Sequence, residues 1–334
     1  MQKLNYSSPD QLIGTCSSWE DFRLAVAALS KKRKGDVFER LVQLYLVTKP
    51  KYRTELSDVW LRREVPTELS KRLCLPTTDE GIDLVVRTRD EKFWAIQAKF
   101  KSSPEKPPTY TKLTNFTNLA FVHCKHMDLA LVAHTSKRPV RKRRLLGNLT
   151  EIGLAEWLST TAEDWALIHR HLRGKPPRPE PRKPLPHQAQ AIAAASKHYV
   201  KEKAHRGKLI MPCGTGKSLT AFWIASALKA RSVVVIVPSL LLIKKCIEDR
   251  TREFVATDEK PCCVCSDDSA GELDEEKDEF VAEVYDLGVQ PLRKLDDIAK
   301  FLNATRRTVA WCLSPIRAAS WWRKPPERLA SPST

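Results

Sequence analysis

The chain has 334 residues, which is room for about two domains. Lys and Arg number 57 and Asp and Glu number 40, so the formal net charge is +17, which favours a polyanionic partner, nucleic acid before an anionic membrane surface. With 42% hydrophobic and 29% charged residues, and no apolar run near the ~18 residues of a membrane helix, the sequence excludes collagen-like, coiled-coil, fully disordered and membrane-spanning chains.

Hydrophobic spacing in the first part of the chain predicts helices followed by strands. The expected elements are helices at residues 17–30 and 35–48, strands at 82–86, 93–100 and 128–134, and helical structure over 151–172. The strands at 82–86 and 93–100 are expected to pair antiparallel, because only a short turn separates them.

Four polar residues in this part suggest phosphodiester chemistry: Glu39, Asp83, Gln97 and Lys99. Residues i and i+2 of a strand face the same side, so Gln97 and Lys99 project together, with Asp83 in reach on the neighbouring strand. Hydrolysis of a phosphodiester needs a divalent ion, and the Asp83 carboxylate and Gln97 amide oxygen suit Mg²⁺. Lys99 can offset the developing charge, and Glu39 could add a carboxylate. The alternative is a plain hairpin whose Lys99 extends into solvent.

Residues 30–135 resemble the Mrr-like branch of the PD-(D/E)XK nuclease superfamily. The matching segments are Gly35-Asp36-Val37-Phe38-Glu39, Gly81-Ile82-Asp83-Leu84 and Gln97-Ala98-Lys99. The resemblance implies a Mg²⁺-dependent nuclease domain with Glu39, Asp83, Gln97 and Lys99 as catalytic residues and the metal on Asp83 and Gln97. Gln97 stands where the superfamily usually has an acid, which gives the ion one fewer formal charge.

A proline-rich segment, GKPPRPEPRKPLP at residues 174–186, marks a boundary. Its six prolines and four basic residues exclude a helix or a sheet interior and favour an extended linker. We therefore expect a nuclease domain over residues 1–172, a linker over 173–186, and a second domain over 187–309.

The second part of the chain has the pattern of a nucleotide-binding α/β unit. The expected elements are an Ala-rich helix at 187–203, a short strand at 208–211, a glycine loop at 212–218, a helix at 219–230 and a buried parallel strand at 232–239. In the loop, Gly214 and Gly216 let backbone N–H groups face phosphates at a helix N-terminus. Lys217 would reach the β- and γ-phosphates, and Ser218 would bind Mg²⁺.

The segment Gly214-Thr215-Gly216-Lys217-Ser218 resembles motif I of superfamily 2 helicases of the DEAD/DEAH type, with Met211 where the general pattern has a glycine. Pro186-His187-Gln188 is similar to the adenine-reading element of that family, and residues 235–245 to the DNA-contacting motif Ia. The resemblance implies ATP binding by Gln188, Gly214, Thr215, Gly216, Lys217 and Ser218, with Ser218 as a ligand of Mg²⁺.

Features expected of a complete helicase lobe are missing. None of the acidic pairs, which are Asp258-Glu259, Asp267-Asp268, Asp274-Glu275, Asp278-Glu279 and Asp296-Asp297, directly follows a four-residue apolar strand as a Walker B element would. Residues 310–334 contain three Trp and four Pro with no coherent period, so we expect an aberrant or disordered tail of a truncated chain.

Nine cysteines at irregular spacing, in a chain whose first residues MQKLNYSSPDQL do not resemble a signal peptide, indicate reduced thiols in the cytoplasm. The only cluster, CCVC at residues 262–265, is expected to be a short buried strand and not a zinc site.

The sequence therefore predicts an α/β chain: a PD-(D/E)XK nuclease domain, with its core at about 30–135, and a partial RecA-like P-loop lobe with a parallel sheet. By resemblance it is the first part of a single-chain, type I-like restriction enzyme of bacteria, acting on double-stranded DNA with Mg²⁺ and ATP. Two alternatives stay open: a non-catalytic DNA- and nucleotide-binding fragment, and an ATP-binding chain whose nuclease fold is a degenerate recognition module. The DNA site, a methylation preference and the oligomeric state are not predicted.

Overall fold

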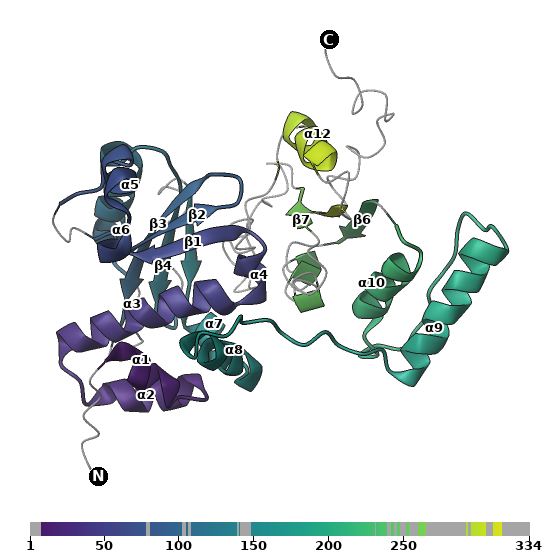
Figure 1. Ribbon diagram of the computed structural model, residues 1–334, viewed down its shortest axis with the longest axis horizontal. Coiled ribbons are helices and arrows are strands. Elements are labelled where there is room, and N and C mark those ends of the chain that lie inside the picture. The colour runs from purple at the N-terminus through teal and green to yellow at the C-terminus, as the bar shows by residue number, and fades with distance from the viewer. Residues whose placement is uncertain are drawn as a thin grey trace, which may run out of the picture. The chain divides into compact units, whose positions relative to one another are not determined.

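The chain forms two units, Met1–Arg178 and Pro179–Thr334, which divide inside the proline-rich segment 174–186 (Figure 1). The structure is a computed structural model. It describes residues 8–77, 81–101, 105, 108–138, 140, 148–230, 232–238, 242–243, 246–247, 252–253, 260–264, 292, 295–304 and 310–315.

The N-terminal unit combines a sheet with helices on both faces. Its helices are α1 (Pro9–Gly14), α2 (Trp19–Ala27), α3 (Lys31–Thr48), α4 (Pro50–Arg53), α5 (Thr67–Arg72), α6 (Tyr110–Asn118), α7 (Leu154–Leu158) and α8 (Ala162–Leu172), with a 3₁₀ turn η1 (Arg62–Glu64) and a π-helical turn η2 (Leu119–His123). Its strands are β1 (Leu56–Leu61), β2 (Leu84–Thr88), β3 (Phe93–Lys99), β4 (Met127–His134) and β5 (Leu149–Ile152).

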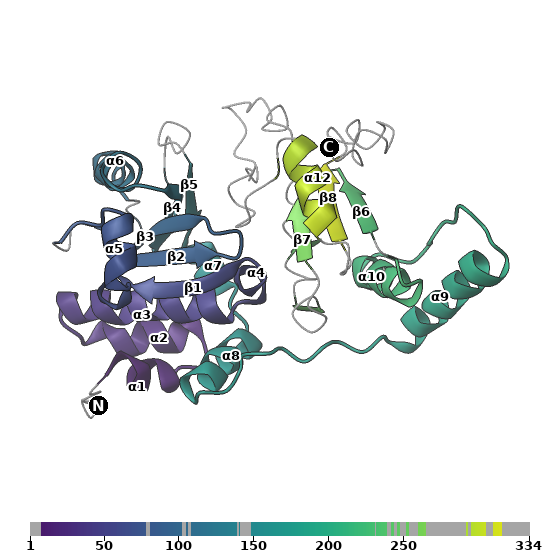
Figure 2. The same cartoon turned by 45° about the horizontal axis from the view of Figure 1, so that its top comes forward.

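The five strands lie in the order β1-β2-β3-β4-β5. The pairs β1/β2 and β2/β3 are antiparallel, and β3/β4 and β4/β5 are parallel. The antiparallel pairing of β2 and β3 confirms the predicted hairpin. In Figures 1 and 2 the sheet lies between α1–α3 on one side and α5 with α6 on the other.

Alternate side chains of β3 enter two separate cores. Trp94 and Ile96 belong to a first core with α1, α2, α3 and the α7–α8 segment. Phe93 and Ala95 belong to a second core, which includes Phe116 of α6. This alternation follows from the two-residue period of a strand, and it means that residues 97 and 99 lie on the second-core side.

An aromatic cluster centred on Trp157 holds the first core together. The ring centroid of Trp157 lies 5.7 Å from that of Trp19, 5.4 Å from Phe38 and 5.0 Å from Tyr45. Its indole Nε1 donates a hydrogen bond to the backbone oxygen of His134 at 3.0 Å. Trp157 therefore ties α7 both to α3 and to the end of β4.

Two N-terminal elements differ from their predicted bounds. α3 begins at Lys31, not at residue 35, because Ser30 caps it by accepting a hydrogen bond from the backbone nitrogen of Arg33, and Lys and Arg are good helix formers. Residues 151–172 are not one helical stretch, since β5 extends to Ile152 and two helices follow it.

Among its described residues, the C-terminal unit contains a three-stranded sheet, three α-helices and one π-helical turn. The elements are α9 (Pro186–Ser196), which continues as a π-helical turn η4 (Lys197–Lys201), α10 (Lys217–Ala227), β6 (Ser232–Val237), β7 (Lys260–Cys263), α12 (Leu295–Ala304) and β8 (Ala310–Pro315). The strand order is β6-β8-β7, with both pairs parallel. β7 confirms the predicted strand at the cysteine cluster, and Cys263 is fully buried.

Three expectations for this unit are wrong. Residues 208–211 are not a strand; Ile210 is 88% exposed, and an apolar run becomes a strand only where a neighbouring strand accepts its hydrogen bonds. Residues 310–315 are not an irregular tail but form β8, because their backbone pairs with β6 and β7 whatever their composition. β6 is parallel as predicted, but it is not buried on both faces, since Val234 and Ile236 are 42% and 45% exposed. Residues 316–334 lie outside the described residues.

In the described part of the chain, no helix is both long and apolar enough to cross a bilayer. The cysteines whose side chains the structure describes, Cys16, Cys74, Cys124, Cys213, Cys246 and Cys263, are free.

Replacing Trp157 should destabilise the N-terminal unit strongly. Trp157→Ala removes three ring contacts and a buried hydrogen bond, and such truncations cost about 3–5 kcal/mol. Leu158→Ala is the matched control, because this neighbour on α7 is 65% exposed and should change the free energy of unfolding by less than about 0.5 kcal/mol. Urea unfolding of the two variants measures the difference; equal effects would contradict the assigned role of Trp157.

Candidate functional site

The first candidate site lies where β2 begins and β3 ends. Asp83 immediately precedes β2, and its backbone nitrogen donates to the oxygen of Ile96 at 2.8 Å. The Asp83 carboxylate accepts a hydrogen bond from the backbone nitrogen of Ala98 at 2.6 Å, and the side chain is only 9% exposed. The β3 backbone therefore fixes the position of this carboxylate.

Lys99 lies on the same face as Asp83. Its Nζ is 3.9 Å from Oδ2 of Asp83, and its side chain is 41% exposed. The backbone thus holds the Asp83 carboxylate in place, while the ammonium group of Lys99 reaches solvent. This is the juxtaposition that the strand alternation predicts for Asp83 and Lys99.

Gln97 shares the face with Lys99 but is nearly buried, at 5% exposure. Its Nε2 donates a hydrogen bond to the backbone oxygen of Gly81 at 2.8 Å. Because the amide nitrogen is engaged there, the amide oxygen is the atom that Gln97 can offer to a cation.

Gly81 explains why an amide occupies position 97. Gly81 has φ +101°, and a Cβ built on it would lie 2.9 Å from Nε2 of Gln97. Glutamate at this position would set a carboxylate oxygen against the Gly81 carbonyl oxygen, two acceptors with no proton between them. The sequence marks Gly81 only as part of the segment Gly81-Ile82-Asp83-Leu84, and its positive φ and its contact with Gln97 appear only in the folded chain.

Glu39 lies on α3, which packs in the first core and so covers the sheet face opposite to Gln97 and Lys99. The helix is nevertheless held near the end of β3, since the rings of Phe38 and Phe100 lie 5.7 Å apart. The side chain of Glu39 is half-buried.

These residues fit a magnesium ion by the chemistry of their donors. Asp83 supplies a carboxylate and Gln97 an amide oxygen, both hard oxygen ligands that leave most positions of an octahedral ion to water and phosphate. Among the residues that the structure describes, no group of three or more His, Cys, Asp and Glu side chains could hold a metal.

A buried histidine that the sequence did not reveal lies beside Lys99. His134 of β4 pairs in register with Lys99, and its side chain is buried. Its Nδ1 accepts a hydrogen bond from the backbone nitrogen of Ser136 at 3.2 Å, which leaves the proton on Nε2, 2.9 Å from the Glu151 carboxylate. The same carboxylate accepts from the backbone nitrogen of Val140 at 2.9 Å. His134 and Glu151 therefore fix the chain after β4 next to the candidate site.

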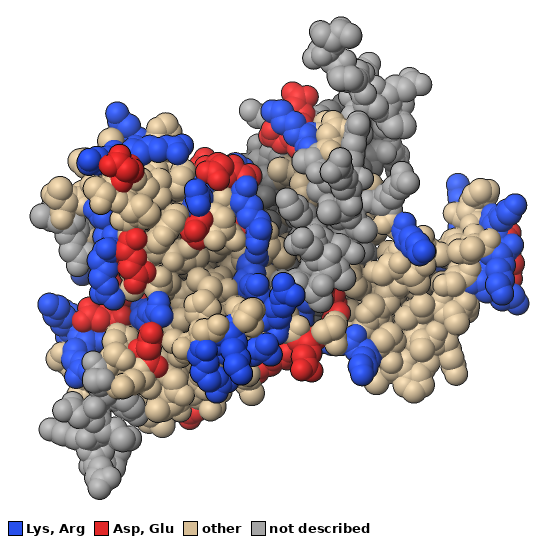
Figure 3. Space-filling view, viewed as in Figure 1, with Lys and Arg blue, Asp and Glu red and all other residues tan. Residues whose placement is uncertain are grey.

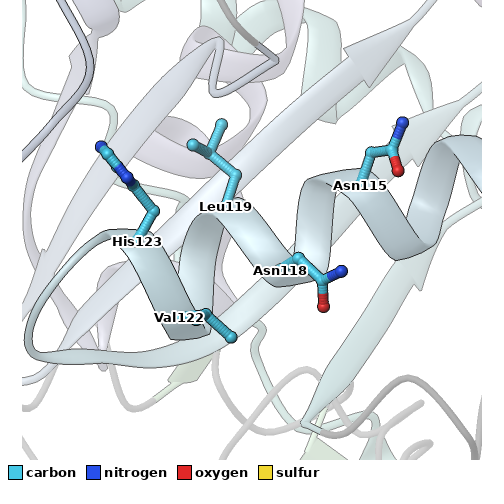
Figure 4. Close-up of a pocket in the computed structure, with 5 residues that line it drawn as sticks. All are labelled: Asn115, Asn118, Leu119, Val122 and His123. Carbon is cyan, nitrogen blue, oxygen red and sulfur yellow. The ribbon is translucent and has the colours of Figure 1, made fainter.

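A shallow hollow on α6 and η2 is lined by Asn115, Asn118, Leu119, Val122 and His123 (Figure 4). Two amides and one imidazole are its polar groups, and Val122 is 79% exposed. It carries neither a carboxylate nor a lysine, so it lacks the groups that hydrolysis of a phosphodiester requires.

The second candidate site is the loop before α10. Gly214 and Gly216 have φ +79° and +77°, a conformation that glycine adopts without strain. Gly216 is the N-cap of α10, so the first backbone N–H groups of that helix face outward from the loop, where they can bind an anion.

Lys217 folds back over this loop. Its Nζ lies 3.1 Å from the backbone oxygens of both Met211 and Pro212. Thr215 stabilises the same turn, because its hydroxyl donates a hydrogen bond to the backbone oxygen of Pro212 at 2.8 Å. Ser218, the expected ligand of Mg²⁺, is exposed in the first turn of α10.

Gln188 is buried and bonds to the backbone of the loop. Its Oε1 accepts from the backbone nitrogen of Leu185 at 2.8 Å, and its Nε2 donates to the oxygen of Thr215 at 3.0 Å. With 5% of its surface exposed, Gln188 joins the start of α9 to the phosphate loop. His187 approaches the same oxygen of Thr215 at 3.3 Å.

Two families match the sequence, one in each unit. Residues 47–142 match the family Mrr_cat_2, described as "Restriction endonuclease"; the match includes Asp83, Gln97 and Lys99 but begins after Glu39. Residues 182–298 match the family ResIII, described as "Type III restriction enzyme, res subunit", and this match includes the loop around Lys217. No curated protein matches the chain.

A solved structure described as "ATP-dependent Type ISP restriction-modification enzyme LlaBIII bound to DNA" is similar in fold, with a TM-score of 0.69 and 20% sequence identity. The alignment covers 95% of this chain and 19% of that one, so the chain spans less than a fifth of the length of this relative. By these two matches, a restriction endonuclease domain over residues 47–142 is followed by a helicase-like domain over residues 182–298, which matches the res subunit of type III restriction enzymes.

Proposed function

We propose that the N-terminal unit is a Mg²⁺-dependent DNA endonuclease of the restriction type, coupled to an ATP-binding, helicase-like unit. The observation that carries this proposal is the approach of Lys99 Nζ to Asp83 Oδ2, 3.9 Å apart, with Gln97 on the same strand face as Lys99. The family match over residues 47–142 supports the nuclease class independently of this geometry.

Each side chain of the site has a separate task in this proposal. Asp83 and Gln97 would hold the ion, which when bound polarises the phosphodiester and lowers the pKa of a water molecule. The hydrogen bond from Ala98 keeps the Asp83 carboxylate in place, so little reorganisation precedes hydrolysis. The exposed ammonium group of Lys99 orients the attacking water and stabilises the charge that grows on the phosphate oxygens.

Glu39 is proposed as a further carboxylate beside this site. The support for it is the packing of α3 against the end of β3 through Phe38 and Phe100.

For the C-terminal unit we propose ATP binding with slow turnover. The support for binding is the loop with two left-handed glycines, together with Lys217 and Ser218 at the start of α10. Slow turnover is proposed because no acidic pair in the sequence directly follows an apolar strand, where the carboxylate that orients the hydrolytic water is expected. We place this activity in the bacterial cytoplasm.

Lys99→Ala should abolish DNA nicking and leave DNA binding nearly unchanged. The variant removes the cation beside the phosphate, and loss of one such group lowers a rate by about 10²–10³. The hydrogen bond between Asp83 and Ala98 stays intact, so the fold of the site is kept. Conversion of supercoiled plasmid to open circles with Mg²⁺, with and without ATP, measures the rate.

Lys71→Ala is the control for this test, because it removes the same charge from a side chain that is 72% exposed on α5. It should nick as fast as the unaltered chain. If the unaltered chain leaves the plasmid closed in Mg²⁺, the nuclease proposal fails and the non-catalytic DNA- and nucleotide-binding alternative is correct.

Gln97→Glu should lower the nicking rate by about tenfold or more, although it introduces the acid that the superfamily usually has. A carboxylate would face the Gly81 carbonyl, now 2.8 Å from the amide nitrogen, and losing a buried hydrogen bond in this way costs about 1–3 kcal/mol. The nicking rate as a function of Mg²⁺ concentration gives the answer. A variant that is faster, or that needs less Mg²⁺, would show that Gly81 does not select the amide.

Lys217→Ala should weaken the binding of MgATP about 10–100-fold, because it removes a charge-assisted contact worth about 1.5–3 kcal/mol. Isothermal titration with MgATP measures the change, and Lys208→Ala, an exposed lysine just before the loop, should bind as the unaltered chain does. DNA-stimulated ATP hydrolysis at the rate of an active helicase, lost in Lys217→Ala, would refute slow turnover.

A further inference from the structure

Three arginines from separate segments of the N-terminal unit lie together at the turn end of the β2–β3 hairpin. Arg53 ends α4, Arg89 lies in the turn between β2 and β3, and Arg178 follows α8. Arg89 donates a hydrogen bond from its guanidinium to the backbone oxygen of Arg53 at 3.3 Å, and Arg53 donates from its own to the backbone oxygen of Pro177. Two backbone contacts thus bring the segments together; we call these three residues the arginine cluster.

The positive charge of the arginine cluster is not neutralised locally. Among the described residues, no carboxylate lies within 4 Å of Arg53, Arg89 or Arg178 as an ion-pair partner, and Arg89 and Arg178 are exposed. Burial, and then the charges of Arg178 and Arg89, lower the pKa of the Arg53 guanidinium. Every resolved influence on Arg53 therefore disfavours its charged form.

Two lysines in the same region, unlike the three arginines, have carboxylate partners. Lys49 pairs with Asp164 at 2.9 Å and Lys51 with Glu156 at 2.9 Å. Like charges that lie close together lower the free energy of unfolding. The two lysines avoid this cost through their acidic partners, whereas the arginine cluster lacks such carboxylate partners among the described residues.

The pKa of His171 indicates how far this positive field extends. Burial lowers it first, followed by the charges of Arg40 and Arg53, against a weaker opposite effect of Asp10. Arg40 already pairs with Asp10 at 2.7 Å, so Arg53 is the contributor without an acidic partner. Lys and Arg side chains gather over α4 and α8 in Figure 3.

We propose that the arginine cluster binds the phosphate backbone of double-stranded DNA, at a place separate from the candidate nuclease site. Arg89 and Lys99 lie at opposite ends of the same hairpin, which is about 20 Å long at 3.3 Å per residue. That distance is about six base pairs of duplex, so one DNA molecule along the hairpin contacts both places. Guanidinium groups suit phosphates because they donate two parallel hydrogen bonds. The assignment builds on the proposed nuclease, but DNA binding at the cluster does not require cleavage.

The test compares two double variants of the full chain that each remove two positive charges. Arg89→Gln with Arg178→Gln removes the exposed members of the cluster. Arg23→Gln with Arg87→Gln removes arginines that already have carboxylate partners, in Glu20 and in Asp58 at 2.7 Å. Binding to a blunt 30-base-pair duplex is titrated at several salt concentrations. Each lost phosphate contact should make the slope of log K against log salt shallower by about 0.9.

The cluster variant should bind at least tenfold more weakly at low salt, with a slope shallower by one to two units, and the control variant should change by less than half as much. An equal loss in both variants would mean that net charge alone matters and would overturn the proposal, as would no loss in either. Equally tight binding of polyglutamate at the same salt would also overturn it, in favour of an acidic protein partner.

A second measurement uses the unaltered chain, so it does not depend on whether the variants fold. Phenylglyoxal modifies accessible arginines, and mass spectrometry locates them. The duplex should protect Arg89 and Arg178 but not Arg23; equal protection of all three, or of none, contradicts the proposal. If Lys99→Ala abolishes nicking while the cluster variant binds DNA normally, the inference fails and the nuclease stands. If binding depends on the cluster but Mg²⁺ never produces nicks, the nuclease fails and the DNA surface stands.

Discussion

The alternation of side chains along β3 is the constraint on which the candidate nuclease site depends. Ile96 and Ala98 enter the first core, and Phe100 packs against it, so Gln97 and Lys99 have to face the other side. The register with β2 then brings Asp83 to that side, where the backbone nitrogen of Ala98 holds its carboxylate. A slip by one residue would turn Lys99 toward the first core and take Gln97 away from Asp83, so packing and chemistry select the same register.

In addition to the strand register, backbone groups determine which side chains fit at the candidate nuclease site. Gly81 presents a carbonyl oxygen at 2.8 Å to position 97, and only a side chain with a donor can meet it. Glutamine satisfies Gly81 through its nitrogen and retains an oxygen for a cation. The amide at position 97 is therefore a consequence of the local backbone. Compared with an acid at this position, the amide offers a cation one negative charge fewer.

The sequence predicted features that follow from period and spacing, and it missed those that depend on contacts between distant segments. The two-residue period of a strand predicts Asp83, Gln97 and Lys99 on one face, because the side to which a residue points depends only on its position along the strand. The run at 208–211 looked equally strand-like, but its pairing depends on a partner strand that its own residues do not encode. The opposite-face position of α3, which carries Glu39, and the arginine cluster likewise depend on how separate segments pack.

The two candidate sites differ in how ready they are for their ligands. At the candidate nuclease site the polar groups are already in place, because backbone atoms hold Asp83 and Gln97. In the loop before α10, Lys217 instead bonds to the neutral carbonyl oxygens of Met211 and Pro212, and the proposed ATP binding requires it to exchange them for phosphate. Phosphate oxygens carry charge and form stronger hydrogen bonds with an ammonium group than carbonyls do. The exchange that the proposed ATP binding requires is therefore favourable, and the two carbonyl oxygens hold the ammonium group over the loop in this structure.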